Sequence, residues 1–543
     1  MTTSATTAPE QAAPASIGRS SALMAAGSLV SRATGFVRSA VVVAALGTTL
    51  LGDGYTVANV VPNMLYVLLI GGALNGVFVP ELVRVAKEHK DGGAAYTDRF
   101  LTVCLTALVV ITAAAVLAAP LLVDAYTDYT GQQAELTTAL ARYCLPQIFF
   151  YGLFTLLGQV LNARGRFGAM MWTPVLSNVV ITAVFGFYLA VAAGGDTLSS
   201  GEARLLGWGT TAGIAVQALA LIPALRGSGF RWRPRFDLRG SGLRRPLRSA
   251  GWLLLLVLSN QGAYWVVTKL STTVGHRAVD SGVDGGAGYM AYSNAQLLWA
   301  VPQGIVTVSL VTALLPRMSR AAAEQDLRAV RADVSYALRS SAALVVPASC
   351  ALLALAPWLI GAVYGYGAAG ADDVAVMAGM LMAFAPGLVA FSGQYVLSRG
   401  FYAMGDTRTP FFLNLVIAGL NALLSYVAYL LLPTRWAVTG MAGAYSVALF
   451  AGFAVTAYTL HRRLPERTAG PGALGAHLRL LAAVVPAGAL GYGAARLVAG
   501  AGDFVAAGAG GAVLLGVVVL LARPLGIPEI GAMLGKVTRR VGR

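Results

Sequence analysis

Long apolar segments follow one another along almost the whole chain, and they constrain its fold more than any other feature. A helix needs about 20 consecutive apolar residues to cross the hydrocarbon core of a bilayer. The sequence therefore predicts an all-α polytopic membrane protein with fourteen transmembrane helices. The expected spans are residues 20–47, 55–83, 98–122, 135–162, 172–194, 204–225, 247–274, 287–315, 334–363, 373–404, 410–432, 437–460, 475–499 and 503–523.

Composition excludes the common soluble classes. Charged residues make up 11% of the 543 residues, against about 25% in a typical soluble domain, and the mean hydropathy is +0.70. So few charges cannot cover the surface of an ordinary cytosolic enzyme of this size. Cys104, Cys144 and Cys350 lie in apolar segments without CxxC spacing, so we expect neither a disulfide framework nor a metal site. HExxH, Walker A and GxSxG motifs are absent, and neither an enzyme nor a cofactor is expected.

The basic residues indicate how the chain is oriented in the membrane. With the N-terminus in the cytoplasm, 30 Lys and Arg fall in cytoplasmic segments and 4 in the outer loops. Such a bias is typical of the positive-inside rule, and it predicts a multi-pass protein of the inner (plasma) membrane with both termini cytoplasmic. The loop 226–248 holds eight of these arginines. It serves as a topology determinant, and it would also attract anionic headgroups. No long basic tract with interleaved aromatics exists, so nucleic-acid binding is not expected.

An internal repeat indicates two similar halves. Pro146, the run 159–165 and Thr173-Pro174 are matched by Pro386, the run 399–405 and Thr409-Pro410, at offsets of 240 and then 236 residues. We expect each Thr-Pro to open a helix, because proline suits the first helical turn. The repeat unit spans six helices in the same orientation, which is a transporter architecture with the site between the halves. The predicted divisions are a disordered tail (1–19), an N-terminal lobe (20–245), a C-terminal lobe (246–470) and two further helices with a basic tail (471–543).

The first expected helix is polar along one face. An arc of about 120° at 100° per residue holds its polar side chains and one glycine. Arg32 and Arg38 lie about 9 Å apart along the axis, and Gly35 between them leaves room for a ligand. Intramembrane charges usually face a water-filled cavity, although arginines can also snorkel to the interface. The residues of this arc are Ser28, Ser31, Arg32, Gly35, Arg38 and Ser39.

Further polar side chains extend this candidate cavity. Asn59 and Asn63 share one face of the second helix, and Gln296 lies on the eighth. These amides suit either a substrate or hydrogen bonds between helices. Asp53 precedes the second helix near the outer surface, where it either pairs with an arginine or is a solvated loop residue.

Several motifs in the chain resemble one known family. Residues 31–38 (SRATGFVR) resemble the S-R-x-x-G-F-x-R signature of the MurJ (MviN) family, and the sequence looks most similar to the actinobacterial members of that family. Further matches follow in order at Asp53-Gly54-Tyr55, Ala58-Asn59, Pro62-Asn63, Gly72-Ala73-Leu74, Phe78-Val79-Pro80, Leu315-Pro316-Arg317-Met318-Ser319 and Gly405-Asp406-Thr407-Arg408-Thr409-Pro410.

The resemblance implies both a fold and a function. This family belongs to the multidrug/oligosaccharidyl-lipid/polysaccharide exporter superfamily, with two six-helix lobes around a cationic cavity and two extra helices forming a groove for a lipid tail. It flips lipid II, the undecaprenyl-diphosphate-linked peptidoglycan precursor, to the outer leaflet. By matching position, Arg32 and Arg38 would bind the diphosphate, with Ser31, Gly35 and Asp53 in support. The implied partners are that lipid, membrane lipids and the proteins of cell-wall synthesis and division.

The chain also departs from the family pattern. Tyr66, Val67 and Gly71 stand where many members have basic residues or an acid, and the family's eighth-helix arginine falls near Gln296 and Leu297. Three hypotheses therefore remain: a lipid II flippase, an exporter of another polyprenyl-linked glycan or amphiphilic drug, and a non-transporting scaffold. For a flippase we expect alternating access driven by the membrane potential, since two charges crossing the field gain roughly 4–5 kcal/mol per 100 mV.

Overall fold

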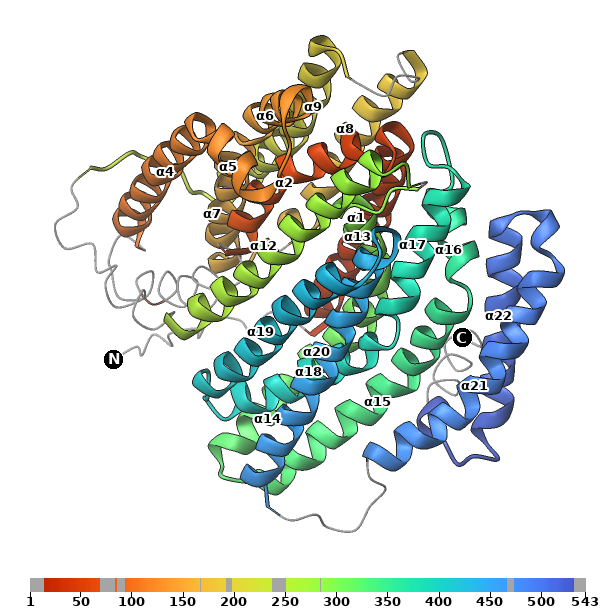
Figure 1. Ribbon diagram of the computed structural model, residues 1–543. Helices are drawn as coiled ribbons and strands as arrows, with labels where there is room; N and C mark the ends of the chain where they lie inside the picture. The colour runs from red at the N-terminus through yellow and green to blue at the C-terminus, as the bar shows by residue number, and fades with distance from the viewer. Residues whose placement is uncertain are drawn as a thin grey trace, which may run out of the picture.

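A computed structural model describes residues 14–68, 84, 93–166, 168–191, 198–236, 251–283, 285–465 and 473–531, and all the regular secondary structure in these ranges is helical (Figure 1). We call α1–α10 the N-terminal bundle and α12–α20 the C-terminal bundle. The N-terminal bundle comprises α1 (Pro14–Leu46), α2 (Leu50–Leu68), α4 (Ala94–Leu117), α5 (Ala119–Tyr126), α6 (Gly131–Cys144), α7 (Gln147–Ala163), α8 (Gly168–Val191), α9 (Ser200–Leu219) and α10 (Leu221–Arg226).

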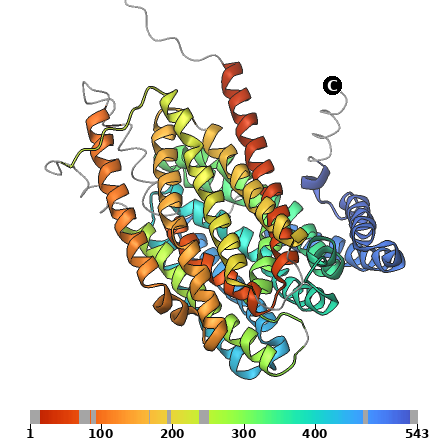
Figure 2. The same ribbon diagram turned by 90° about the horizontal axis from the view of Figure 1, so that it is seen from above.

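The C-terminal bundle is followed by a separate pair of helices. The bundle comprises α12 (Gly251–Asp280), α13 (Tyr289–Pro302), the π-helix η2 (Gln303–Thr307), α14 (Val308–Ala323), α15 (Leu327–Ala354), α16 (Ala356–Tyr364), α17 (Ala371–Phe384), α18 (Gly387–Ala403), α19 (Arg408–Leu431) and α20 (Thr434–Arg463). The pair comprises α21 (Ala473–Leu497) and α22 (Asp503–Ala522), joined by the short η3 (Ala499–Ala501), and it lies at one side of the molecule in Figure 2. It packs on α15 through small side chains such as Ala342 and Ala483.

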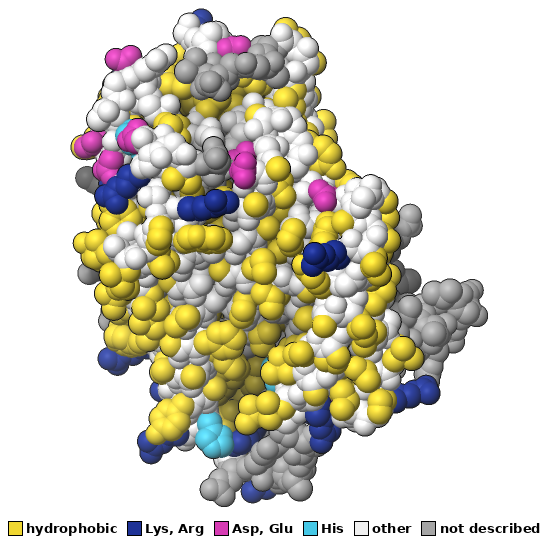
Figure 3. Space-filling model, turned by 45° about the vertical axis from the view of Figure 1, so that its right-hand side comes forward, with side chains coloured by type: hydrophobic (Ala, Val, Ile, Leu, Met, Phe, Trp, Pro, Cys, Tyr) yellow, Lys and Arg dark blue, Asp and Glu magenta, His cyan; other side chains and the backbone are white. Residues whose placement is uncertain are grey.

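The two bundles bury a shared apolar core. Val43 of α1, Phe185 of α8, Trp299 of α13 and Phe384 of α17 belong to one continuous cluster. Outside it, large apolar side chains are exposed on many helices, as expected for surfaces that face lipid. Figure 3 shows this as a broad hydrophobic belt, with the acidic side chains of that face gathered at one end of the molecule.

The repeated segments have the same backbone conformation. Pro146 directly precedes α7, and Pro386 directly precedes α18. After each helix a glycine takes a positive φ, 73° at Gly165 and 77° at Gly405, and the next residue donates its N–H to a carbonyl five residues back. This is the Schellman termination that glycine favours. The two Thr-Pro pairs differ, however.

Pro410 lies in the first turn of α19, as expected, whereas Pro174 lies inside α8. The expectation that Thr173-Pro174 opens a helix is therefore wrong. Helix α8 begins at Gly168, and this start puts Pro174 in the second turn, where a missing N–H bends a helix.

The expected count of fourteen spans is not confirmed. Among the described residues, eleven helices are long and apolar enough to cross a membrane, or twelve if α17 and α18, bent by 44°, form one span. The two expected spans that are missing from this count are 55–83 and 247–274. Residues 69–83 and 247–250 lie outside the described residues. Helix α12, which crosses the body in Figure 1, carries polar side chains such as Asn260, Gln261 and Lys269 that lower its apolarity.

The expected divisions of the chain are only partly visible. Residues 14–19 belong to helix α1 and not to a disordered tail, while residues 1–13 lie outside the described part. The expected boundaries at 245/246 and 470/471 also fall on residues that are not described.

Candidate functional site

Arg32 and Arg38 lie on α1, six residues and therefore about 9 Å apart along its axis. The Arg32 side chain is exposed and the Arg38 side chain is half-buried. Within the described ranges neither guanidinium makes a hydrogen bond or an ion pair with protein groups. Both charges are thus available to a ligand.

Arg32 reaches from the N-terminal bundle to the C-terminal bundle. Its guanidinium lies against Gly304, where an added Cβ would come within 2.5 Å of Arg32 Nη1. Gly304 belongs to η2, a π-helical turn that follows Pro302 in the middle of a long helix. Such turns interrupt the regular ladder and are frequent at functional sites. The sequence analysis missed η2, and the only local signal for it is the Pro302-Gln303-Gly304 run.

The rest of the polar face of α1 is divided between two neighbours. Asn178 of α8 donates hydrogen bonds to the Ser31 carbonyl and to Thr34 Oγ1, each at 3.0 Å. A Cβ at Gly35 would also meet the Asn178 amide, at 3.5 Å. This is an ordinary van der Waals distance, so Gly35 lies beside α8, and the expectation that it leaves room for a ligand stays a prediction. Ser28 is half-buried.

Ser39 faces the opposite bundle. Its hydroxyl hydrogen-bonds to the Asn294 side chain of α13 and lies 3.3 Å from the hydroxyl of Tyr364 in α16. One turn further along, Ala44 accepts a hydrogen bond from the Ala368 N–H at 2.8 Å. These contacts begin a line of polar interactions between the bundles, which we call the seam.

Asp53 is the buried centre of the seam. Its side chain is 0% exposed, and Oδ1 accepts the Met290 N–H at 2.6 Å in the first turn of α13. A carboxylate is favourable at a helix N-terminus, because unpaired N–H groups point at it. The other oxygen, Oδ2, packs against Gly275 and Gly288, where there is no space for a Cβ atom on either residue. Both sequence hypotheses for Asp53, an arginine pair and a solvated loop, are therefore wrong.

A second carboxylate closes the seam from the other side. Asp373 of α17 accepts hydrogen bonds from the Thr48 hydroxyl at 2.5 Å, from the Gly286 N–H at 2.6 Å and from the Gly370 N–H at 2.8 Å. Thr48 belongs to the α1–α2 connection and Gly286 to the α12–α13 connection. Sequence reasoning missed Asp373, since no local pattern relates it to residues more than 80 positions away.

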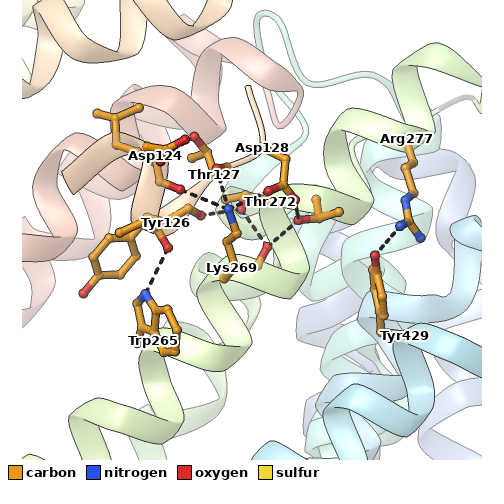
Figure 4. A network of polar contacts seen from close by, with 12 residues as sticks. Asp124, Tyr126, Thr127, Asp128, Trp265, Lys269, Thr272, Arg277 and Tyr429 are labelled. Carbon is orange, nitrogen blue, oxygen red and sulfur yellow. Dashed lines mark hydrogen bonds and ion pairs between the residues drawn. The ribbon is translucent and has the colours of Figure 1, made fainter. Parts of the chain in front are cut away.

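An ion pair forms the third part of the seam (Figure 4). Lys269 of α12 lies 2.6 Å from Asp128 Oδ1, and its Nζ also donates to the Asp124 and Thr127 carbonyls. Thr272 donates to the Tyr126 carbonyl at 2.8 Å. Partial burial of Asp128 acts to raise its pKa, but the hydrogen bonds and charge of Lys269 outweigh this effect and leave the pKa below its usual value.

The remaining predicted residues lie elsewhere. Gln296 lines a cavity of 310 Å³ inside the C-terminal bundle, together with other uncharged amide and tyrosine side chains. Asn59 accepts a hydrogen bond from Gln147 at 2.9 Å within the N-terminal bundle, and Asn63 is exposed on α2. The residues that the sequence predicted to form one site therefore lie in different places: the two arginines on α1, the seam, and an uncharged cavity in the C-terminal bundle. No cluster of His, Cys, Asp or Glu among the described residues has the arrangement of a metal site.

Comparisons with known proteins agree with this architecture. The family model described as "Lipid II flippase MurJ" matches residues 42–507. The chain is 28% identical over 410 residues to "Lipid II flippase MurJ" of Burkholderia cenocepacia, covering 74% of this chain and 76% of that protein. It is 27% identical over 441 residues to "Probable lipid II flippase MurJ" of Rhizobium tropici, covering 80% and 79%.

Solved structures show the same fold. The structure titled "Lipid II flippase MurJ, inward closed conformation" matches with a TM-score of 0.73 and 17% identity, covering 93% of this chain and 99% of that one. An inward-facing multidrug transporter of the MATE family in the MOP superfamily matches with a TM-score of 0.62 and 15% identity, covering 79% and 95%. The family match begins at residue 42, so it does not extend to Arg32 or Arg38.

Proposed function

Since the chain belongs to the lipid II flippase MurJ family, we propose that Arg32 and Arg38 bind the diphosphate of lipid II while its headgroup crosses the membrane. The chain is a transporter of peptidoglycan biosynthesis and not an enzyme. The observation that carries the proposal is that two arginines on one membrane-spanning helix have no carboxylate partner in the described structure. Intramembrane charges without partners are costly unless a ligand or water meets them.

Arginine suits this task for a chemical reason. A diphosphate cannot cross hydrocarbon unaided, because desolvation of an ion costs tens of kcal/mol in the Born limit. The planar guanidinium stays charged and pairs with phosphate oxygens through two parallel hydrogen bonds. The polyprenyl tail needs no such help, because it can remain in lipid.

The seam supports alternating access as the mechanism. Its hydrogen bonds and ion pair hold the two bundles together at the end of α1 beyond Ser39, whereas Arg32 lies exposed nearer the other end. With both termini in the cytoplasm of the inner membrane, the seam closes the outer side and the arginines are accessible from the inner leaflet. Opening the seam would then release the headgroup outward, and the membrane potential favours that direction for an anion.

A flipping assay tests the proposal. In proteoliposomes with fluorescent lipid II, Arg32→Ala and Arg38→Ala should each lower the flipping rate by about 10- to 100-fold, since a hydrogen bond to a charged group contributes about 1.5–3 kcal/mol. Arg32→Lys and Arg38→Lys should retain part of the rate. Arg204→Ala and Arg435→Ala, which remove equal charges from the expected outer loops, are the controls.

Three other results would contradict parts of this proposal. Unchanged flipping in both alanine variants would remove the arginines from the transport path. Normal flipping of another polyprenyl-linked glycan with none of lipid II would change the substrate. A wild-type protein that flips no lipid but still binds cell-wall synthesis or division proteins would indicate a scaffold.

A further inference from the structure

An extended segment after α10 runs along α4 and closes a groove there. Residues 230–236, which we call the strap, follow α10 and are drawn in yellow-green in Figure 2. The Arg233 N–H donates to Asp98 Oδ1 at 3.1 Å, and the Arg235 N–H donates to Thr102 Oγ1 at 3.0 Å. Two residues of extended chain and four residues of α-helix both advance about 6 to 7 Å. The strap therefore runs parallel to α4 in matched register.

The strap alternates between aromatic or apolar residues and arginines. Phe230, Trp232, Pro234 and Phe236 alternate with Arg231, Arg233 and Arg235. Phe230 anchors the segment, since it is 3% exposed and the Arg164 guanidinium lies 4.9 Å from its ring centroid. Trp232 and Phe236 remain 42% and 76% exposed. Aromatic rings beside arginines are typical of the boundary between hydrocarbon and headgroups.

The groove under the strap is large and mostly apolar. It has a volume of 990 Å³, at the upper end of the roughly 300–1,000 Å³ of ligand pockets. Leu105, Leu153 and Leu157 are among its walls, and Arg226 and Arg231 are the charged residues in its lining. The adjacent side chains of α4, Val109 and Val110, are 54% and 62% exposed. An acyl chain can therefore enter the groove sideways without leaving hydrocarbon.

We propose that this groove binds one acyl chain of an anionic phospholipid, with the lipid phosphate on Arg226 and Arg231. The two arginines attract a headgroup with a net negative charge, and a zwitterionic lipid has no such net charge. The apolar walls and exposed rings provide the surface for the chain. In the proposed orientation this lipid belongs to the cytoplasmic leaflet, and its binding to the groove does not depend on flipping.

Quenching of Trp232 fluorescence tests the site. Purified full-length protein in detergent is titrated with dibrominated phosphatidylglycerol or dibrominated phosphatidylcholine, and the Trp232 signal is taken as the difference between wild type and W232F. Each arginine contributes about 1 kcal/mol near an anionic headgroup. For each arginine that binds the lipid, half-quenching by phosphatidylglycerol should therefore need a mole fraction about fivefold lower than half-quenching by phosphatidylcholine. Leu153→Phe, which fills the groove, should weaken quenching by both lipids.

Charge variants provide the matched control. Arg226→Glu with Arg231→Glu should abolish the preference for phosphatidylglycerol, while Arg204→Glu with Arg435→Glu should retain it at the same net charge. Equal half-quenching by the two lipids in wild type, or a preference that survives in the Arg226/Arg231 variant, would overturn the proposal. Relief of quenching by equimolar undecaprenyl phosphate but not by phosphatidylglycerol would also overturn it, because the groove would then hold a prenyl tail.

Discussion

At the residue scale, the tightest requirement in the seam lies at Gly288. A Cβ at this position would stand 1.9 Å from Asp53 Oδ2, and Asp53 is completely buried against the start of α13. An added Cβ would force either the Asp53 side chain or the start of α13 to shift. Glycine is therefore required here by close approach, and its backbone conformation is an ordinary extended one.

We predict that Gly288→Ala lowers the stability of the closed protein by about 1–3 kcal/mol, the usual cost of overpacking a buried site. Thermal unfolding of the purified protein should show a lower Tm than wild type. Gly262→Ala on α12 is the matched control, because a Cβ there meets no atom within 4 Å. A Gly288→Ala protein as stable as the Gly262→Ala protein would show that the seam is looser than the contacts around Asp53 indicate.

At the scale of elements, the repeat preserves a turn as well as a pattern of residues. Gly165 after α7 and Gly405 after α18 both have positive φ, and a Cβ at either position would meet nothing within 4 Å. Any effect of an added methyl group must therefore come from the backbone. The left-handed conformation costs a residue with a Cβ roughly 1–2 kcal/mol.

We predict that Gly165→Ala and Gly405→Ala each destabilise the protein by that amount and that asparagine at either position costs less. Chemical denaturation monitored by tryptophan fluorescence can measure both. Gly419→Ala within α19, which also meets no atom, should be neutral or slightly stabilising, since a helical glycine is unfavourable. Unequal losses of stability at the two positions would mean that the two turns, although alike in conformation, do not contribute equally to the stability of their bundles.

At the scale of the whole molecule, the seam joins two bundles that the proposed alternating-access mechanism requires to separate. Ser39 and Asn294 are hydrogen-bonded across it from different bundles. Thr34 and Asn178 are hydrogen-bonded at 3.0 Å within one bundle. Both pairs are in hydrogen-bonding contact, but under the proposed mechanism only the first pair separates.

We predict that a disulfide between S39C and N294C stops lipid II flipping and that reduction restores it. The experiment uses a background without Cys104, Cys144 and Cys350, with cross-linking measured by gel shift and flipping in proteoliposomes. A disulfide between T34C and N178C is the control and should leave flipping intact. Continued flipping with the first pair fully cross-linked would show that the seam does not open during transport.

The sequence by itself determined the membrane class, the helical repeat and the position of two arginines on one helix. These features depend on local quantities: the apolar length that a bilayer demands, the helical period and the chemistry of short motifs such as residues 31–38. The family assignment followed from the same motifs, and the match over residues 42–507 confirmed it.

Only the tertiary structure decided which of the polar residues meet. Asp53 finds Met290 at a separation of 237 residues, and Thr48 finds Asp373 at a separation of 325. Gly35 packs on α8, and Gln296 lines a different cavity from the arginines. Helical periodicity shows which side of one helix is polar, but it carries no information on the neighbour that covers that side. The neighbour depends on how two bundles dock, and that docking is a property of the whole chain.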